Sequence, residues 1–148
     1  MFTSTTAGQN VSVGACNMYA TTTGDNNTSI GTLSMCLNTT GSNNVAAGVY
    51  SLRANTTGNV NTALGRPAII TTTTGAHNPA SGILALYANT TGNSNTASGY
   101  RALCANTTGT NNLALGQCAG AANTTGSNQT WIGNSSTTNT TIYGCVSA

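Results

Sequence analysis

The chain has 148 residues, enough for one ordinary domain, but only four of them are charged: Asp25, Arg53, Arg66 and Arg101. The net charge of +2 comes from three scattered arginines rather than a basic patch, so a nucleic-acid partner is not expected. The longest apolar run, 83–88, is far too short to span a bilayer, so membrane insertion is not expected either.

The first ten residues have no basic start and no apolar stretch, and so they do not read as a secretory signal. Asn-Thr-Thr, a glycosylation triplet, recurs along the chain. Either these asparagines carry glycans or the repeat merely contains the triplet, and we favour the second interpretation because no secretory signal is evident. The triplet begins at Asn38, Asn55, Asn89, Asn106 and Asn123.

Two series of glycines run through the chain, each in steps of 17 residues without insertion or deletion. The first is Gly14, Gly31, Gly48, Gly65, Gly82, Gly99, Gly116 and Gly133. The second is Gly24, Gly41, Gly58, Gly75, Gly92, Gly109 and Gly126. A fixed period held in register is typical of a solenoid and argues against the disorder that low charge with low apolar content would otherwise suggest. We therefore predict an all-β fold, a parallel β-solenoid (β-roll) of 17-residue coils.

Positions are counted from the first glycine series, which is offset 0. Residues 1–132 are predicted to form the repeat array, a partial first coil at 1–13 followed by seven coils, and 133–148 a degenerate last coil or C-terminal transition. The pattern weakens there: Gly120 and Thr137 replace a large residue, Trp131 replaces a small one, and Tyr143 replaces a glycine.

Each coil is predicted to contain two short strands and two glycine corners. Residues 95–99 alternate as a strand does, and 102–105 suggest a second strand. Glycine suits corners because it accepts positive φ, and the abundance of Thr and Gly opposes a helix. Coils stacked about 4.8 Å apart would build a rod roughly 40 Å long.

Uniform columns are expected to face the interior, and variable columns to face solvent or a partner. Offsets 3, 6, 13 and 15 are nearly uniform in small residues or Asn, whereas offsets 1, 2, 5, 11 and 12 vary. Offset 4 carries a large apolar row: Met18, Met35, Leu52, Ile69, Leu86 and Leu103. Since a core of Ala, Ser and Gly looks thin, we expect this row and the apolar residues at offset 16 to be buried between chains, most simply in a homotrimer.

Catalysis is not expected, because acid–base chemistry needs positioned carboxylates or histidines and the chain has only Asp25 and His77, in different coils. No cofactor is expected, and the cysteine spacing gives no zinc pattern. Stacked cysteines fall at mismatched offsets, which predicts mostly free thiols at Cys16, Cys36, Cys104, Cys118 and Cys145.

Two stretches carry a family resemblance. Asn-Thr-Ala-x-Gly at 61–65 and 95–99 resembles the head repeats of trimeric autotransporter adhesins, and the longer unit at 99–109 looks like repeats of phage and phage-like tail-fibre proteins. The resemblance implies a left-handed parallel β-roll, three chains side by side, and attachment to surfaces. The self-cleaving chaperone domain of tail fibres and the stalk and anchor of adhesins are not seen in this sequence.

Three functions are compatible with these features. The first is a fibre-like or adhesin-like rod on a virion or cell surface, whose partners would be further copies of itself and a cell-surface glycan or protein. The second is a subunit of an extracellular or viral filament, because both ends fall within a repeat and open coils expose unpaired strand edges. The third is an ice-binding solenoid, suggested by threonine columns at offsets 8 and 9.

Overall fold

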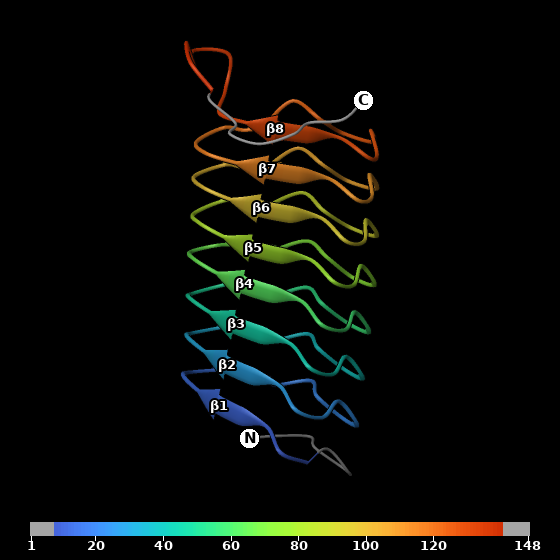
Figure 1. Cartoon of the computed structure of the whole chain (residues 1–148). Coiled ribbons are helices and arrows are strands. Elements are labelled where there is room, and N and C mark those ends of the chain that lie inside the picture. Colours follow the sequence, from blue (N-terminus) through green and yellow to red (C-terminus); the bar gives the residue numbers. More distant parts are fainter. Residues whose placement is uncertain (1–7, 141–148) are drawn as a thin grey trace.

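The computed structural model describes residues 8–140, which form a single coiled rod (Figure 1). Each coil contributes one three-residue strand to one parallel sheet, in the order of the sequence. The strands are β1 (Val11–Val13), β2 (Thr28–Ile30), β3 (Val45–Ala47), β4 (Thr62–Leu64), β5 (Pro79–Ser81), β6 (Thr96–Ser98), β7 (Leu113–Leu115) and β8 (Thr130–Ile132). No helix occurs within 8–140, and the predicted all-β parallel solenoid is confirmed.

The register of the sheet follows the sequence period. Every paired residue lies 17 positions from its partner, as in Ala46 with Ala63 and Ala97 with Ala114. The predicted strand at 95–99 is therefore present as β6. Pro79, which has no N–H to donate, stands at the first residue of β5, one of the few places where a strand tolerates proline.

The prediction of a second strand at 102–105 is wrong. The backbone there alternates between negative and positive φ: Arg101 has φ 57° and Leu103 has φ 50°, and similar positive values recur at offsets 2 and 4 of the other coils between residues 14 and 132, apart from Pro67. A chain that turns at every second residue cannot extend as a strand. It still bonds from coil to coil, since Leu86 N donates to Ala102 O at 3.0 Å and Leu103 N to Ala119 O at 2.9 Å.

The two glycine series serve different purposes. Gly99 has φ 134°, a conformation essentially limited to glycine, and a Cβ there would lie 2.5 Å from Gly116 O. Gly92 has no positive φ, so the expectation that both corners need glycine for its backbone freedom is wrong. At Gly92 a Cβ would instead collide with Asn89 Oδ1 and Gly109 O. The left-handed turn near this corner is made at offset 12, for example by Asn111.

The interior is filled by five columns. Offsets 3, 13 and 15 are buried through most of the rod, as predicted, but offset 6 is only half-buried, for instance at Ala54 and Ala88. Its place is taken by offset 7, whose asparagines are fully enclosed from Asn38 to Asn106. The offset-4 row also lies inside a single chain: Met35, Leu52, Ile69, Leu86 and Leu103 are completely buried without any partner.

Two ladders of buried asparagine link successive coils. At offset 13, Asn95 N donates to Asn78 Oδ1 at 3.0 Å while Asn95 Nδ2 donates to Gly109 O at 2.8 Å. At offset 7, Asn106 Nδ2 donates to Asn89 Oδ1 at 3.0 Å and to Gly109 O. The side-chain amides thus satisfy one another and the corner carbonyls, which is what allows polar groups to be buried in so narrow a core.

Candidate attachment surface

The exterior of the rod divides into three surfaces, each made by particular columns. The first, here called the variable face, consists of the residues at offsets 1, 2 and 5, which follow the corner glycine. These columns are mostly exposed or half-buried; Cys36 is the buried exception. They are one surface rather than three separate columns: the guanidinium of Arg53, at offset 5, lies over the ring of Tyr50, at offset 2, and offset 1 directly precedes offset 2 in the chain.

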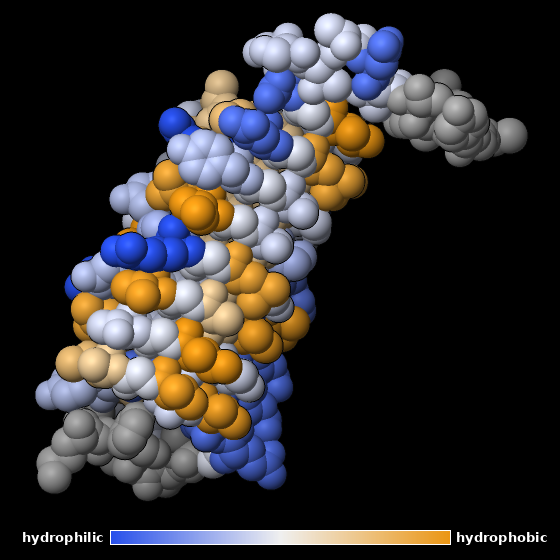
Figure 2. All heavy atoms as spheres, turned by 90° about the vertical axis from the view of Figure 1, so that its left-hand side faces the viewer, coloured by the Kyte–Doolittle hydropathy of each residue, from blue (hydrophilic) through white to orange (hydrophobic). Residues whose placement is uncertain are grey.

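The second surface, the sheet stripe, is the outer side of the strands. Alternation along each strand turns offset 15 inward and offsets 14 and 16 outward. Several large apolar side chains are exposed there, and none of the strand residues is charged. The stripe contains Val11, Val13, Ile30, Val45, Leu64, Leu115 and Ile132. Figure 2, which faces the edge of the rod beside the sheet, shows exposed apolar side chains in separate groups along the rod, with weakly and strongly hydrophilic residues between them.

The third surface, the threonine row, is the exposed column at offset 9. Each of the seven full coils between residues 14 and 132 supplies a threonine to it: Thr23, Thr40, Thr57, Thr74, Thr91, Thr108 and Thr125. The neighbouring offset-8 threonines are only half-buried in most coils, and their hydroxyls bond inward to the next coil, as Thr90 Oγ1 does to Thr107 O at 3.0 Å. Only one of the two threonine columns is therefore fully displayed.

The predicted site residues fall in different parts of this arrangement. The corner glycines Gly14 to Gly133 line one edge of the rod, and the apolar row lies in the core rather than on any surface. Asp25 and His77 lie on the turn at offsets 11 and 12, in the first and fourth full coils, and the fold does not bring them together. Asp25 Oδ1 instead accepts a hydrogen bond from Gly8 N at 2.6 Å.

The glycosylation triplets belong to the interior. Asn38, Asn55, Asn89 and Asn106 are completely buried, and their Nδ2 groups donate to carbonyl oxygens of the core. A glycan on any of these four nitrogens would be incompatible with the folded rod. This supports the interpretation that the triplet is part of the repeat.

The cysteines in the described part of the chain are free thiols, as predicted; Cys145 lies outside the described residues. Cys16 is exposed and Cys36 is buried at the base of the variable face. Burial raises the pKa of the Cys36 thiol, which the charge of Arg53 partly opposes. No group of three or more His, Cys, Asp or Glu side chains able to hold a metal ion occurs within residues 8–140.

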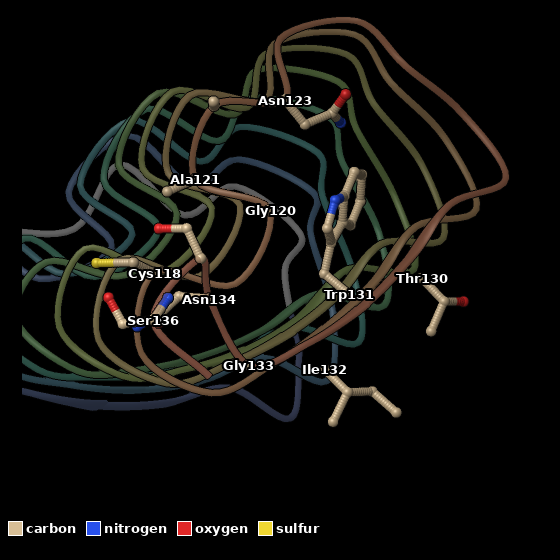
Figure 3. Close-up of a pocket in the computed structure, with 12 residues that line it drawn as sticks. Cys118, Gly120, Ala121, Asn123, Thr130, Trp131, Ile132, Gly133, Asn134 and Ser136 are labelled. Atoms are coloured by element: carbon tan, nitrogen blue, oxygen red, sulfur yellow. Dashed lines mark hydrogen bonds between the residues drawn. The ribbon is translucent and has the colours of Figure 1, made fainter. Parts of the chain in front are cut away.

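One hollow of about 760 Å³ lies at the C-terminal end of the described coils (Figure 3). Trp131 points into it from β8, whereas Thr130 and Ile132 point outward and the sulfur of Cys118 points away on the other side. Cys118 is the one ionisable side chain among the residues that line the hollow. The hollow therefore offers no acid–base pair for catalysis.

Sequence reasoning identified the exposed columns but missed how they are grouped. Each of Arg53, Arg66 and Arg101 was visible as a rare charge, yet nothing in the sequence revealed that offsets 1, 2 and 5 share one face. The buried asparagines of offset 7 were also missed, although their constancy was a usable sign.

No protein-family model, curated protein or solved structure matches this chain. The described residues contain no helix long and apolar enough to cross a membrane.

Proposed function

We propose that the chain is a structural rod, a fibre-like or adhesin-like segment that displays variable side chains for attachment to a host or another surface. The observation that carries this proposal is the separation of constant and variable columns. Side chains at offsets 3, 4, 7, 13 and 15 fill the interior, while those at offsets 1, 2 and 5 change from coil to coil without entering it. Such a scaffold holds its shape while its outer surface varies.

In this proposal the chains associate side by side through the sheet stripe, in a trimer. The apolar row gives no reason to expect association, because one chain already buries it. The stripe does: Val13 and Ile30 remain 56% and 48% exposed, and exposed apolar residues occur on the uncharged strands β1–β4 and again on β7 and β8, with Ser81 and Ser98 between the two groups. Exposed apolar surface of this kind commonly marks a protein–protein contact.

Mass measurement by light scattering, with electron micrographs of the same sample, tests this assembly. We expect a discrete threefold mass and no fibres, and we expect Ile30→Ser/Leu64→Ser/Leu115→Ser to lower the mass toward one chain. Val60→Ser, an exposed apolar residue on another turn, is the matched control and should leave the mass unchanged. A wild-type chain that stays monomeric at high concentration would contradict the proposal.

A filament subunit is the second candidate. The observation that favours it is that β8 is the last strand of the sheet formed by residues 8–140, so a strand of another copy would add to the sheet beside it. Axial stacking would give long fibres one molecule wide in the same micrographs.

Ice binding is the third candidate, favoured by the threonine row, which repeats one exposed hydroxyl per coil. The columns beside it are irregular: offset 12 includes Asn43, Val60, His77 and Ser94. A thermal-hysteresis assay tests this candidate directly, and we expect no activity.

A further inference from the structure

The positive charges of the rod all lie on the variable face. Arg66 is at offset 1, Arg101 at offset 2 and Arg53 at offset 5, and all three are exposed. The chain has a single acidic residue, Asp25, and it belongs to the turn at offset 11 rather than to this face. The variable face therefore attracts anions although the net charge of the whole chain is only +2.

Aromatic rings lie on the same face. Tyr19 and Tyr87 occupy offset 5, Tyr50 offset 2 and Tyr100 offset 1. The guanidinium of Arg53 lies 5.9 Å from the centre of the Tyr50 ring. Arg101 directly follows Tyr100 in the chain. The face thus combines guanidinium groups with flat amphipathic surfaces, the combination that is enriched where proteins bind other molecules.

The spacing of the arginines indicates which kind of anionic polymer fits the variable face. Arg53, Arg66 and Arg101 belong to the third, fourth and sixth full coils, so they lie about 5 Å and about 10 Å apart along the axis. Duplex DNA carries one charge per roughly 1.7 Å, far more than three cations could neutralise. Sparse cations suit a polymer whose anionic groups are separated by uncharged rings. Arginine is also suited to planar carboxylate and to sulfate groups, which accept its paired N–H donors.

We propose that the variable face binds an acidic polysaccharide. The arginines pair with its carboxylate or sulfate groups, and the tyrosine rings lie against its sugar rings. This rests on the proposed attachment function and specifies the chemistry of the partner. Three such contacts on one chain give modest affinity, which several rods side by side would raise through multivalency.

The test is binding of the intact chain to immobilised hyaluronate and heparin, with neutral dextran and single-stranded DNA as comparison ligands. We expect binding to one or both acidic polysaccharides, weakened at least tenfold between 50 and 500 mM salt as screening demands. We expect Arg53→Gln/Arg66→Gln/Arg101→Gln to reduce it at least tenfold. Because all three arginines are exposed, circular dichroism should show the variant folded.

The matched control is Thr23→Glu/Thr57→Glu/Thr91→Glu, which changes the net charge by the same three units on the threonine row. It should retain binding to within about threefold. Equal losses in the two variants would overturn the proposal, because they would show attraction by net charge alone. Equal binding to dextran, equal or tighter binding to DNA, or no binding to either acidic polysaccharide would overturn it too. A discrete trimer that binds no acidic polysaccharide would reject this inference and leave the proposed rod intact.

Discussion

Trp131 packs directly on the backbone of Gly120. A Cβ added to Gly120 would lie 2.8 Å from Cε3 of the indole ring, and 3.0 Å from Cδ2 of Leu103 in the coil below. In earlier coils the core holds a large residue at offset 4 and a small one at offset 15. The last full coil exchanges them, with glycine at offset 4 and tryptophan at offset 15. The volume lost at offset 4 is therefore regained at offset 15 of the same coil.

This exchange predicts strong coupling between the two positions. Trp131→Ala should cost about 2 kcal/mol, less than the roughly 3–5 kcal/mol of a fully enclosed tryptophan because the ring is half-exposed. Gly120→Leu alone should also destabilise, since its side chain would meet the ring. The double variant restores the pattern of Leu103 and Ala114 and should be more stable than either single one. Urea unfolding of all four proteins gives the coupling energy, and additive effects would contradict the packing.

The offset-7 ladder has a gap that substitution should repair. Thr72 stands between Asn55 and Asn89, and its hydroxyl donates to Asn89 O at 3.0 Å. Asn55 Oδ1 is left buried without a hydrogen-bond partner. Thr72→Asn would supply the missing Nδ2 donor, and we expect a gain of about 1 kcal/mol. Thr74→Asn, on the exposed threonine row, is the control. A loss of stability in Thr72→Asn would show that threonine is required there.

The interior and exterior apolar rows should respond differently to the same truncation. Leu86→Ala should cost about 2–5 kcal/mol, because its side chain is completely buried in one chain. Leu64→Ala, on the sheet stripe, removes a side chain that is 40% exposed and should cost less than about 1 kcal/mol in the dissociated chain. Unfolding below the concentration at which chains associate makes the comparison. Equal effects would mean that the assignment of the two rows is mistaken.

The two glycine series should both reject alanine, for different reasons. Gly99→Ala combines a glycine-only φ, worth about 1–3 kcal/mol, with a clash against Gly116 O. Gly92→Ala has an ordinary φ, so its cost comes from contacts of the added Cβ with Asn89 Oδ1 of the asparagine ladder and with Gly109 O. Replacing Asn89 with alanine should therefore lessen the cost of Gly92→Ala and leave that of Gly99→Ala unchanged. Thermal melts of the single and double variants test this, and rescue of Gly99→Ala would contradict it.

Thiol reactivity should follow burial. The raised pKa of Cys36 leaves less thiolate than an ordinary cysteine has at any pH below its titration, and burial also restricts access. At pH 8 we expect iodoacetamide to label the exposed Cys16 at least tenfold faster than Cys36, as measured by fragment-ion mass spectrometry. In urea the two rates should converge. Equal rates in the native protein would show that the base of the variable face is open.

The 17-residue period and the strand β6 were predictable from the sequence because each produces a pattern that can be seen directly in the residues. Strict 17-residue glycine spacing fixes the coil, and alternation at 95–99 fixes β6. No such pattern in the sequence predicts the turn at 101–104. Positive φ at Arg101 and Leu103 contradicts the preference of those residues, and backbone hydrogen bonds between coils, such as that from Leu103 N to Ala119 O, stabilise it. The short apolar and small-residue pattern there resembled a strand instead.

The candidate surface was less predictable than the fold. Whether Tyr50 meets Arg53 depends on how the chain turns between offsets 2 and 5. The sequence predicted a strand in this part of the coil, and so it predicted the wrong path for the backbone. Burial of the offset-4 row was expected, but it was assigned to contacts between chains because the interior seemed too small. The asparagine ladders explain how one chain can enclose this row. Fully hydrogen-bonded side-chain amides, such as that of Asn95, fill part of the core that apolar side chains would otherwise have to fill.

The hydrogen bonds between coils also determine which changes in length the chain can absorb. Asn78 and Asn95 are joined because they stand 17 residues apart, and so are Ala80 and Ala97 in the sheet. Adding or removing a single residue would shift every later side chain out of its column. Gain or loss of a whole coil would preserve all of them. Tandem duplication is thus the tolerated route to a longer molecule, and its length can change only in increments of about 4.8 Å.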